Sequence, residues 1–440
     1  MIFKCTHEDK RDPMMMSPLT QLLEALKTQG KSPLFLSLIA AMILLSYSML
    51  RGPSEALFLE YHDKTLLPGL WIETGLGALL TVAIYNRLLN LFSLIGLFHL
   101  SLAGSACVFA LLSSGLFPFE EGVFSLGEFK FPFGPVTLLR IACDLYIVVL
   151  VETFWSLTNL HFSVKSATHL YGLFGVAGSI GSMVGNTIAT FSRSLGTENI
   201  IRSAIPIFLL MMITLRGLQK HLRTRVDHEQ SSKRSSSLLS GISVVARSRT
   251  LLLIAALVLL SQLAVNLIDY QYNGLLKSLY PDVNARSAMN ATVYLTIDIG
   301  AIVMQLLTGM TLTLLGVGMV LTSIPSILAL SVLSAMISPV FWVMALAKSS
   351  SKFFTYSIFK SAKELLYLPL SYAEQTQGKA VIDILVYRQA KLLTSILLLG
   401  LAARGIENQI VNLLTLAVIG LWIIISISLW RITRDEAQKS

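Results

Sequence analysis

The residues of this sequence that could do chemistry are ionisable side chains that interrupt long apolar segments. A charged group at the centre of a bilayer costs about 2.5–3.5 kcal/mol on insertion scales, so such residues are kept mainly where they bind an ion, a substrate or one another. Each of them is therefore a candidate site residue. They are Arg51, Glu55, Glu73, Arg140, Asp144, Glu152, Asp269, Asp298, Lys348, Lys352, Asp383, Arg388 and Lys391.

Four of these cations fall on two neighbouring apolar segments. Lys348 and Lys352 are four residues apart, and Arg388 and Lys391 are three apart, so each pair shares one face of a helix. Few acidic residues lie near them, and uncompensated positive charge that faces a central cavity favours an anionic ligand. The alternative is a set of ion pairs across the helices, in which Lys348 and Lys391 contact Asp298 or Asp383.

Two further pairs could neutralise themselves within one helix. Arg51 and Glu55 are four residues apart, and so are Arg140 and Asp144. This spacing places opposite charges side by side on a helix face. For the second pair, the structural and the functional interpretations have equal weight.

The signatures of common enzymes and pumps are absent. Gly30-Lys31-Ser32 matches the end of the P-loop motif of nucleotide-binding proteins. The first position of that motif requires glycine, but it is Ala25 here. The histidines form no metal-binding spacing, and there is no Gly-x-Ser-x-Gly motif. A glycine series with no preceding strand predicts close helix packing and no phosphate loop; it comprises Gly172, Gly175, Gly178, Gly181 and Gly185. We expect no catalysis, no metal and no cofactor.

The elements that carry these residues are long apolar helices. Of 440 residues, 54% are hydrophobic and only 13% are charged, whereas soluble domains are about 25% charged. A helix needs about 20 apolar residues to cross hydrocarbon. Such segments lie near 34–51, 66–86, 91–113, 136–159, 170–192, 201–217, 250–275, 290–314, 316–337, 339–359, 382–402 and 408–430. The sequence therefore predicts an all-α polytopic membrane protein with about 12 transmembrane helices.

The apolar segments form two groups of six around one long polar insert. This arrangement is typical of the major facilitator class, in which the binding site lies at the membrane midplane between the halves. We predict an N-terminal cytoplasmic segment with an amphipathic helix at 1–33, six-helix halves at 34–217 and 250–430, a cytoplasmic linker at 218–249 and a tail at 431–440.

The distribution of Lys and Arg predicts the orientation. Outside the apolar segments they concentrate on the side that holds the N-terminus, the linker and the C-terminus, whereas the loop at 114–135 carries Glu120, Glu121 and Glu128 against Lys130. Cytoplasmic loops carry the excess of Lys and Arg, so both termini are expected to be cytoplasmic in a cell (inner) membrane. We interpret the net charge of +9 as the excess of Lys and Arg in the cytoplasmic loops. We therefore expect the partners to be lipid and a small anion, and not nucleic acid.

The stretch 356–391 resembles a known family. It reads YSIFKSAKELLYLPLSYAEQTQGKAVIDILVYRQAK and is similar to the bacterial and plastid ATP/ADP translocase (nucleotide transporter) family. That family has a Tyr-Ser-Leu-Phe stretch, Lys-Glu, an aromatic residue with Pro-Leu, Gly-Lys-Ala, and a downstream Asp, Arg and Lys. The matching residues are Tyr356, Ser357, Phe359, Lys363, Glu364, Tyr367, Pro369, Leu370, Gly378, Lys379, Ala380, Asp383, Arg388 and Lys391.

Weaker matches extend the resemblance to both halves. Asn266-Leu267-Ile268-Asp269 stands where the family has Asn-Leu-Val-Glu, and Arg51 and Glu55 lie in its helix 1 motif. The family's spacing in helices 4 and 5 is kept by Phe154, Trp155, Asn159, Ala167, Tyr171, Leu173, Phe174 and Gly175.

The resemblance implies an alternating-access transporter that exchanges nucleotides, ATP against ADP, driven by gradients without hydrolysis. We expect four cations, Lys348, Lys352, Arg388 and Lys391, to bind phosphate oxygens. Asp269, Asp383 and Glu364 are expected to position these cations or to gate the cavity. Lys363 and Lys379 are expected near the cytoplasmic mouth. The predicted substrate-binding residues are Arg51, Glu55, Asp269, Lys348, Lys352, Lys363, Glu364, Lys379, Asp383, Arg388 and Lys391.

The sequence also departs from the family pattern. The lysine of helix 1 that the family uses in nucleotide binding is Ser54 here, and the acidic residue expected early in helix 4 falls near Cys143, with Asp144 one place away. Two alternatives therefore stay open. One is a transporter of the same fold for another anionic metabolite, and the other is a transport-inactive membrane interaction protein whose working surface is the linker.

Overall fold

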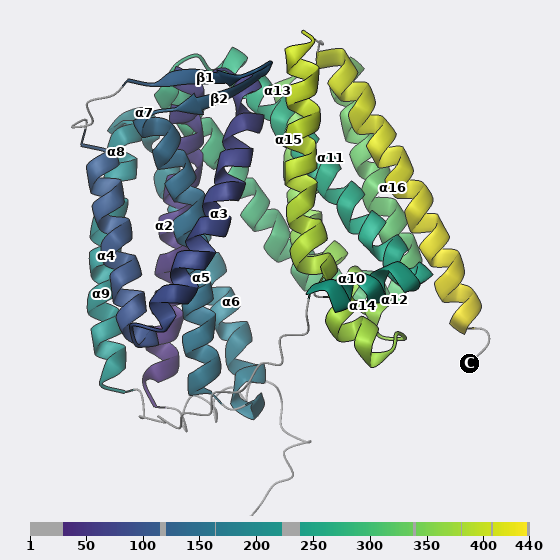
Figure 1. Ribbon diagram of the computed structural model, residues 1–440, viewed down its shortest axis with the longest axis horizontal. Helices are drawn as coiled ribbons and strands as arrows, with labels where there is room; N and C mark the ends of the chain where they lie inside the picture. Colours follow the sequence, from purple (N-terminus) through teal and green to yellow (C-terminus); the bar gives the residue numbers. More distant parts are fainter. Residues whose placement is uncertain are drawn as a thin grey trace, which may run out of the picture.

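The computed structural model describes residues 30–114, 120–162, 164–221, 238–337, 340–379, 381–405 and 408–437. Most of the predicted segment 1–33, with its amphipathic helix, and the centre of the predicted linker lie outside these residues. Within them the chain is almost wholly helical (Figure 1).

The N-terminal helices begin where the sequence places Pro or Ser. Pro is found in the first turn of the helices that start at Ser32, Leu67 and Pro135, where its missing N–H is no loss. Ser93 caps another helix by accepting a hydrogen bond from the Gly96 N–H. These elements are α2 (Ser32–Tyr61), η2 (Lys64–Leu66), α3 (Leu67–Leu89), α4 (Leu94–Leu112), α5 (Pro135–His161), α6 (Val164–Thr190), α7 (Ser192–Leu195), α8 (Thr197–Arg202) and α9 (Ala204–Gln219).

The C-terminal elements include one helix that turns sharply. Gly316 has φ 74 and ψ 162, a conformation that favours glycine, and it divides the 55-residue α12 into two helices. These elements are α10 (Leu238–Arg247), α11 (Arg249–Leu279), α12 (Val283–Ile337), α13 (Phe341–Tyr356), α14 (Ile358–Tyr367), the π-helices η3 (Glu374–Gly378) and η4 (Val381–Val386), α15 (Tyr387–Ala403) and α16 (Asn408–Ala437).

The fold is that of a helical protein that crosses a membrane several times, as predicted. Among the described residues, eight helices are long and apolar enough to cross a bilayer. The predicted number of twelve stays a prediction. Leucines are widely exposed on the outer faces of the helices, for example Leu306 at 80% and Leu314 at 72%. Such apolar surface fits contact with lipid better than contact with water.

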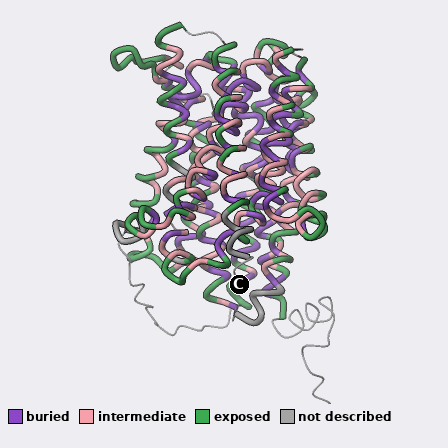
Figure 2. Tube along the Cα trace, turned by 90° about the vertical axis from the view of Figure 1, so that its right-hand side faces the viewer, coloured by how far each residue is buried: buried purple, intermediate pink, exposed green. Residues whose placement is uncertain are grey.

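The helices form two bundles, each with a large core, and the core of the C-terminal bundle also includes residues of α2 and α3 such as Phe58 and Leu70 (Figure 1). One core runs from Leu36 to Leu218, and the other lies mainly in residues 245–429. In Figure 2 buried residues run through the middle of the helical body and exposed ones form its surface. The bundles approach each other at the top of Figure 1 and diverge towards the bottom, where α9 ends and α10 begins. We call these the hairpin end and the linker end.

A β-hairpin at the hairpin end was not predicted. β1 (Gly122–Leu126) pairs antiparallel with β2 (Phe129–Phe133), and Ser125 lies opposite Lys130. The sequence indicates only an acidic loop here, because five-residue strands give little alternation to recognise. Gly69 allows close contact, since a Cβ there would lie 2.8 Å from the Lys130 carbonyl oxygen. The hairpin is thereby packed on the start of α3.

Three of the five glycines of the α6 series, Gly178, Gly181 and Gly185, pack closely against α2, as predicted, whereas a Cβ on Gly172 or Gly175 would meet nothing within 4 Å. A Cβ on Gly181 would lie 2.0 Å from the Ala41 carbonyl oxygen, and one on Gly185 would lie 2.3 Å from that of Leu45. Both contacts join α6 to α2 within one bundle. The backbone of α6 therefore lies directly against α2.

We expect Gly181→Ala to destabilise the protein by about 1–3 kcal/mol, because the added methyl group overlaps backbone that cannot move aside. Gly175→Ala is the matched control on the same helix, since its Cβ would meet nothing within 4 Å. This control should stay within about 1 kcal/mol of the wild type. Thermal unfolding in detergent measures both, and equal melting temperatures would contradict the packing argument.

Candidate substrate site

Two lysines of α13 share one carboxylate of α11. Lys348 Nζ lies 3.3 Å from Asp269 Oδ1 and Lys352 Nζ lies 2.6 Å from Asp269 Oδ2. The Lys348 side chain is 0% exposed and also lies over the Tyr272 ring, 3.8 Å from its centroid. The expectation that this cationic face is uncompensated is therefore wrong. One carboxylate for two lysines still leaves one positive charge in excess.

Tyr294 of α12 joins cations from both bundles. Its ring centroid lies 3.6 Å from Arg51 Cζ, 4.7 Å from Lys348 Nζ and 5.7 Å from Lys352 Nζ. Cations are attracted to the face of an aromatic ring at such distances. Arg51 belongs to α2, whereas the lysines belong to α13, so Tyr294 brings predicted site residues of both halves together.

Glu55 does not neutralise Arg51 in the way that the spacing of four residues suggested. Its carboxylate accepts hydrogen bonds from Asn273 Nδ2 at 2.8 Å, Asn290 Nδ2 at 3.0 Å and the Tyr294 hydroxyl at 3.0 Å. All three donors belong to the C-terminal bundle. Glu55 lies on the opposite bundle, and helix geometry alone could not predict these partners. The correction is that Glu55 ties α2 to α11 and α12.

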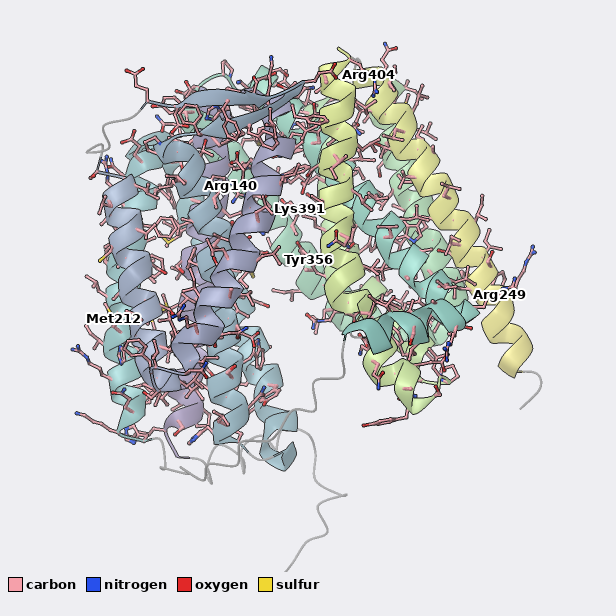
Figure 3. All side chains as sticks on the ribbon, in the orientation of Figure 1. Arg140, Met212, Arg249, Tyr356, Lys391 and Arg404 are labelled. Carbon is pink, nitrogen blue, oxygen red and sulfur yellow. The ribbon has the colours of Figure 1, made fainter. Side chains whose placement is uncertain are left out.

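Arg140 and Asp144 form the predicted pair within α5, with Nη1 and Oδ1 2.7 Å apart. Lys391 of α15 lies close enough to both residues, and to Lys352, to interact electrostatically. Its Nζ lies 5.4 Å from the centroid of Trp71 of α3, and Figure 3 shows it on the side of α15 that faces the other bundle. The alternative pairings of Lys391 with Asp298 or Asp383 do not occur.

Four predicted residues lie apart from this cluster, at the linker end. Lys363 Nζ lies 2.5 Å from Asp383 Oδ1, and Lys379 Nζ contacts Glu364 Oε2. These pairs join α14 to the segment that contains η3 and η4. The structure therefore groups them with one another and away from Lys348 and Lys391. The side chain of the predicted Arg388 lies outside the described residues.

Tyr294, Asn273 and Asn290 are site residues that were not predicted from the sequence. A signal was present, because Asn290 and Tyr294 are four residues apart in an apolar helix and polar groups in membrane helices usually contact other helices. The donors that hold Glu55 are neutral, so a search for charged residues in apolar segments does not find them.

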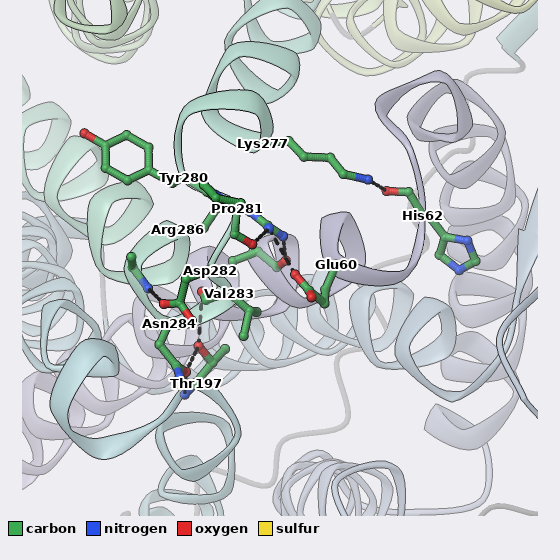
Figure 4. A network of polar contacts seen from close by, with 12 residues as sticks. Glu60, His62, Thr197, Lys277, Tyr280, Pro281, Asp282, Val283, Asn284 and Arg286 are labelled. Atoms are coloured by element: carbon green, nitrogen blue, oxygen red, sulfur yellow. Dashed lines mark hydrogen bonds and ion pairs between the residues drawn. The ribbon is translucent and has the colours of Figure 1, made fainter.

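A polar network closes the contact between the bundles at the hairpin end (Figure 4). Arg286 Nη2 lies 3.0 Å from Glu60 Oε2, and Nη1 donates to the Ala56 carbonyl oxygen at 3.0 Å. Asn284 Oδ1 accepts a hydrogen bond from the Thr197 backbone N–H at 2.7 Å. Lys277 Nζ donates to the His62 carbonyl oxygen at 2.9 Å. These bonds join α11 and α12 to α2 and α8.

A pocket of about 440 Å³ also lies at the hairpin end, beside this network. It is lined by α2, α4, α5 and α8, with Glu121 and Arg202 among its polar residues. Glu121 is already bonded to His62 at 2.7 Å and to Thr137 at 3.1 Å. None of the predicted substrate-binding residues lines this pocket, so the cationic cluster is the better candidate site.

Comparison with known proteins gives one family. The family model described as TLC ATP/ADP transporter matches residues 136–431. ADP,ATP carrier protein 1 of Chlamydia muridarum is 23% identical over 427 residues, which are 82% of this chain and 79% of the relative. The chloroplastic ADP,ATP carrier protein 1 of Arabidopsis thaliana is 22% identical, over 88% of this chain and 72% of the relative.

Solved structures share the fold. The nucleoside transporter NupG superposes with a TM-score of 0.66 at 11% identity, over 92% of this chain and 99% of the other. The inward-open xylose transporter XylE from E. coli gives a TM-score of 0.55 at 12% identity, over 90% and 95%. These similarities confirm the predicted major-facilitator-like architecture.

Proposed function

Because this chain belongs to the TLC ATP/ADP transporter family, we propose that it exchanges adenine nucleotides across a membrane by alternating access. It is a multi-pass transporter and not an enzyme. ATP and ADP would be its cargo, and no cofactor is needed, because exchange is driven by the gradients of the two nucleotides.

The observation that carries this proposal is the excess of positive charge between the bundles. The cations there outnumber the carboxylates that contact them. Lys391 has no carboxylate within 4.0 Å among the described residues, and the same holds for Arg51. We infer that Arg51, Lys352 and Lys391 bind phosphate oxygens, which form strong charge-assisted hydrogen bonds with Lys and Arg.

Asp269 and Tyr294 position these cations in our proposal. Asp269 holds Lys348 and Lys352 on one side of α13, while Tyr294 holds Arg51 beside them. A bound phosphate would add negative charge where positive charge is in excess. Binding would then stabilise the arrangement in which both bundles contact the nucleotide.

We further infer that the linker end faces the cytoplasm of a cell (inner) membrane. The Lys and Arg distribution supports this orientation. The network around Arg286 would then close the outer side, and the structure would correspond to an inward-facing state. Opening to the outside requires that the Arg286–Glu60 and Asn284–Thr197 contacts break.

Ser54 favours a second candidate, the transport of a different anionic metabolite. It is 0% exposed, and its hydroxyl donates to the Arg51 carbonyl oxygen of the same helix at 3.1 Å. At the position of the family's helix 1 lysine, this chain therefore offers no charge to a substrate. Other phosphorylated solutes would satisfy the remaining cations equally well.

Reconstitution into liposomes tests the proposal. Labelled ATP should enter vesicles loaded with ADP at least about tenfold faster than vesicles loaded with buffer, because exchange requires a counter-substrate on the inner side. Uptake of another phosphorylated metabolite without uptake of ATP would support the second candidate. No uptake of any anion, with a protein partner bound through 218–249, would instead support the interaction protein.

A further inference from the structure

A carboxylate at the contact between α6 and α12 is not used by the proposed phosphate site. Asp298 Oδ2 accepts hydrogen bonds from Ser182 Oγ at 2.6 Å and from Asn186 Nδ2 at 2.7 Å. Ser48 Oγ of α2 lies 2.7 Å from Ser182 Oγ. One acid of the C-terminal bundle therefore contacts two neutral polar side chains of the N-terminal bundle, and Ser48 extends the cluster through Ser182.

This cluster has acceptor atoms without donors. Among the described residues, no Lys or Arg lies within 4.0 Å of Asp298, and its Oδ1 accepts no hydrogen bond. Asn186 is 0% exposed, and its Oδ1 has no partner. A buried acceptor without a donor, such as Asn186 Oδ1, is destabilising. The cluster is thus suited to a ligand that brings several hydrogen-bond donors.

The cluster borders the cations. Arg51 is close enough to Asp298 and to Tyr356 to interact electrostatically with both, and Arg51 also contacts Tyr294. Tyr356 is 50% exposed and lies between the bundles in Figure 3. Asp298 therefore marks the α6 side of the cationic region, whereas Lys391 marks the side of α3 and α15.

The charge of Asp298 decides which part of a nucleotide could lie there. A carboxylate repels phosphate but accepts hydrogen bonds from hydroxyl groups. Two neighbouring hydroxyls can donate to one carboxylate, and acidic residues bind the ribose of dinucleotides in this way in other folds. The phosphates would then lie towards Lys352 and Lys391, and the ribose towards Asp298.

We infer that Asp298, together with Asn186 and Ser182, recognises the ribose hydroxyls of the transported nucleotide, an inference that rests on the proposed function. The 2′-hydroxyl donates to Asp298 Oδ1, and the neighbouring 3′-hydroxyl donates to Asn186 Oδ1. The site thereby selects ribonucleotides over deoxyribonucleotides. Because the cluster also joins α6 to α12, ribose binding acts at a contact that changes when the bundles move.

Competition by ATP and 2′-deoxy-ATP for exchange of labelled nucleotide tests this inference. A hydrogen bond to a charged group contributes about 1.5–3 kcal/mol, so dATP should compete at least about tenfold more weakly in the wild type. In Asp298→Asn, the affinity for ATP should fall to near that for dATP. Thr296→Val is the control, because Thr296 is exposed and bonds only its own helix.

The outcomes separate three explanations. If Asp298 only ties the bundles together, Asp298→Asn lowers ATP and dATP exchange by the same factor, and the inference is overturned. If the wild-type protein exchanges ATP and dATP equally well, the inference is also overturned, while the proposed function stays intact. This measurement needs no variant, so it does not depend on whether Asp298→Asn folds. Wild-type protein that exchanges no nucleotide overturns the proposed function and this inference with it.

Discussion

Lys391→Gln should lower nucleotide exchange by about 10–100-fold, which corresponds to the loss of one charge-assisted hydrogen bond to phosphate. Lys391 is partly buried, contacts the Trp71 ring at 5.4 Å and has no carboxylate within 4.0 Å among the described residues. Its removal leaves no buried anion unpaired. The variant should therefore fold with a melting temperature close to that of the wild type.

Exchange of labelled ATP in ADP-loaded liposomes measures this effect. Lys391→Arg keeps the charge and should retain part of the activity. Lys360→Gln is the matched control, because Lys360 is exposed on α14 at the linker end and should be neutral. Full exchange by Lys391→Gln would remove Lys391 from the substrate site, and with it the main support for an anion between the bundles.

Asp269→Asn is expected to affect both stability and transport. The substitution leaves Lys348, which is 0% exposed, and Lys352 without their shared carboxylate. Breaking a buried ion pair by removing one partner costs about 3–5 kcal/mol. We expect a clear drop in the melting temperature in detergent, together with loss of exchange, since the two lysines are no longer held in place.

A second substitution separates these two effects. Lys348→Met in the Asp269→Asn background removes the buried charge and keeps an apolar side chain against Tyr272. The double variant should recover most of the lost stability, because an apolar replacement of a buried ion pair is often neutral. Its exchange should stay low, since Lys352 remains unpositioned. Recovery of both would show that Asp269 has only a structural role.

The cluster also suggests how substrate binding and movement are linked in the proposed mechanism. Tyr294 contacts Arg51 with its ring and Glu55 with its hydroxyl, and both residues belong to the opposite bundle. A phosphate that draws Arg51 away from the ring would weaken this contact between the bundles. In this scheme, the substrate acts on the residues that hold the bundles together.

Much of the architecture could be predicted from the sequence alone. Apolar segments of about 20 residues specify membrane helices wherever they occur, and the major-facilitator-like fold and the transporter family are confirmed. The Arg140–Asp144 pair and the close packing of Gly181 could also be predicted, although the partner helix of Gly181 could not. Each of these depends on the geometry of one helix or on the size of one residue.

The partners of the charges were decided only by the tertiary structure. Lys348 and Lys352 pair with Asp269 of another helix, and Glu55 binds Asn273, Asn290 and Tyr294 and not Arg51. The spacing along one helix shows which residues share a face, but not which face meets which neighbour. That depends on how each helix is rotated about its axis when the bundles pack, and the packing of all the side chains sets this rotation.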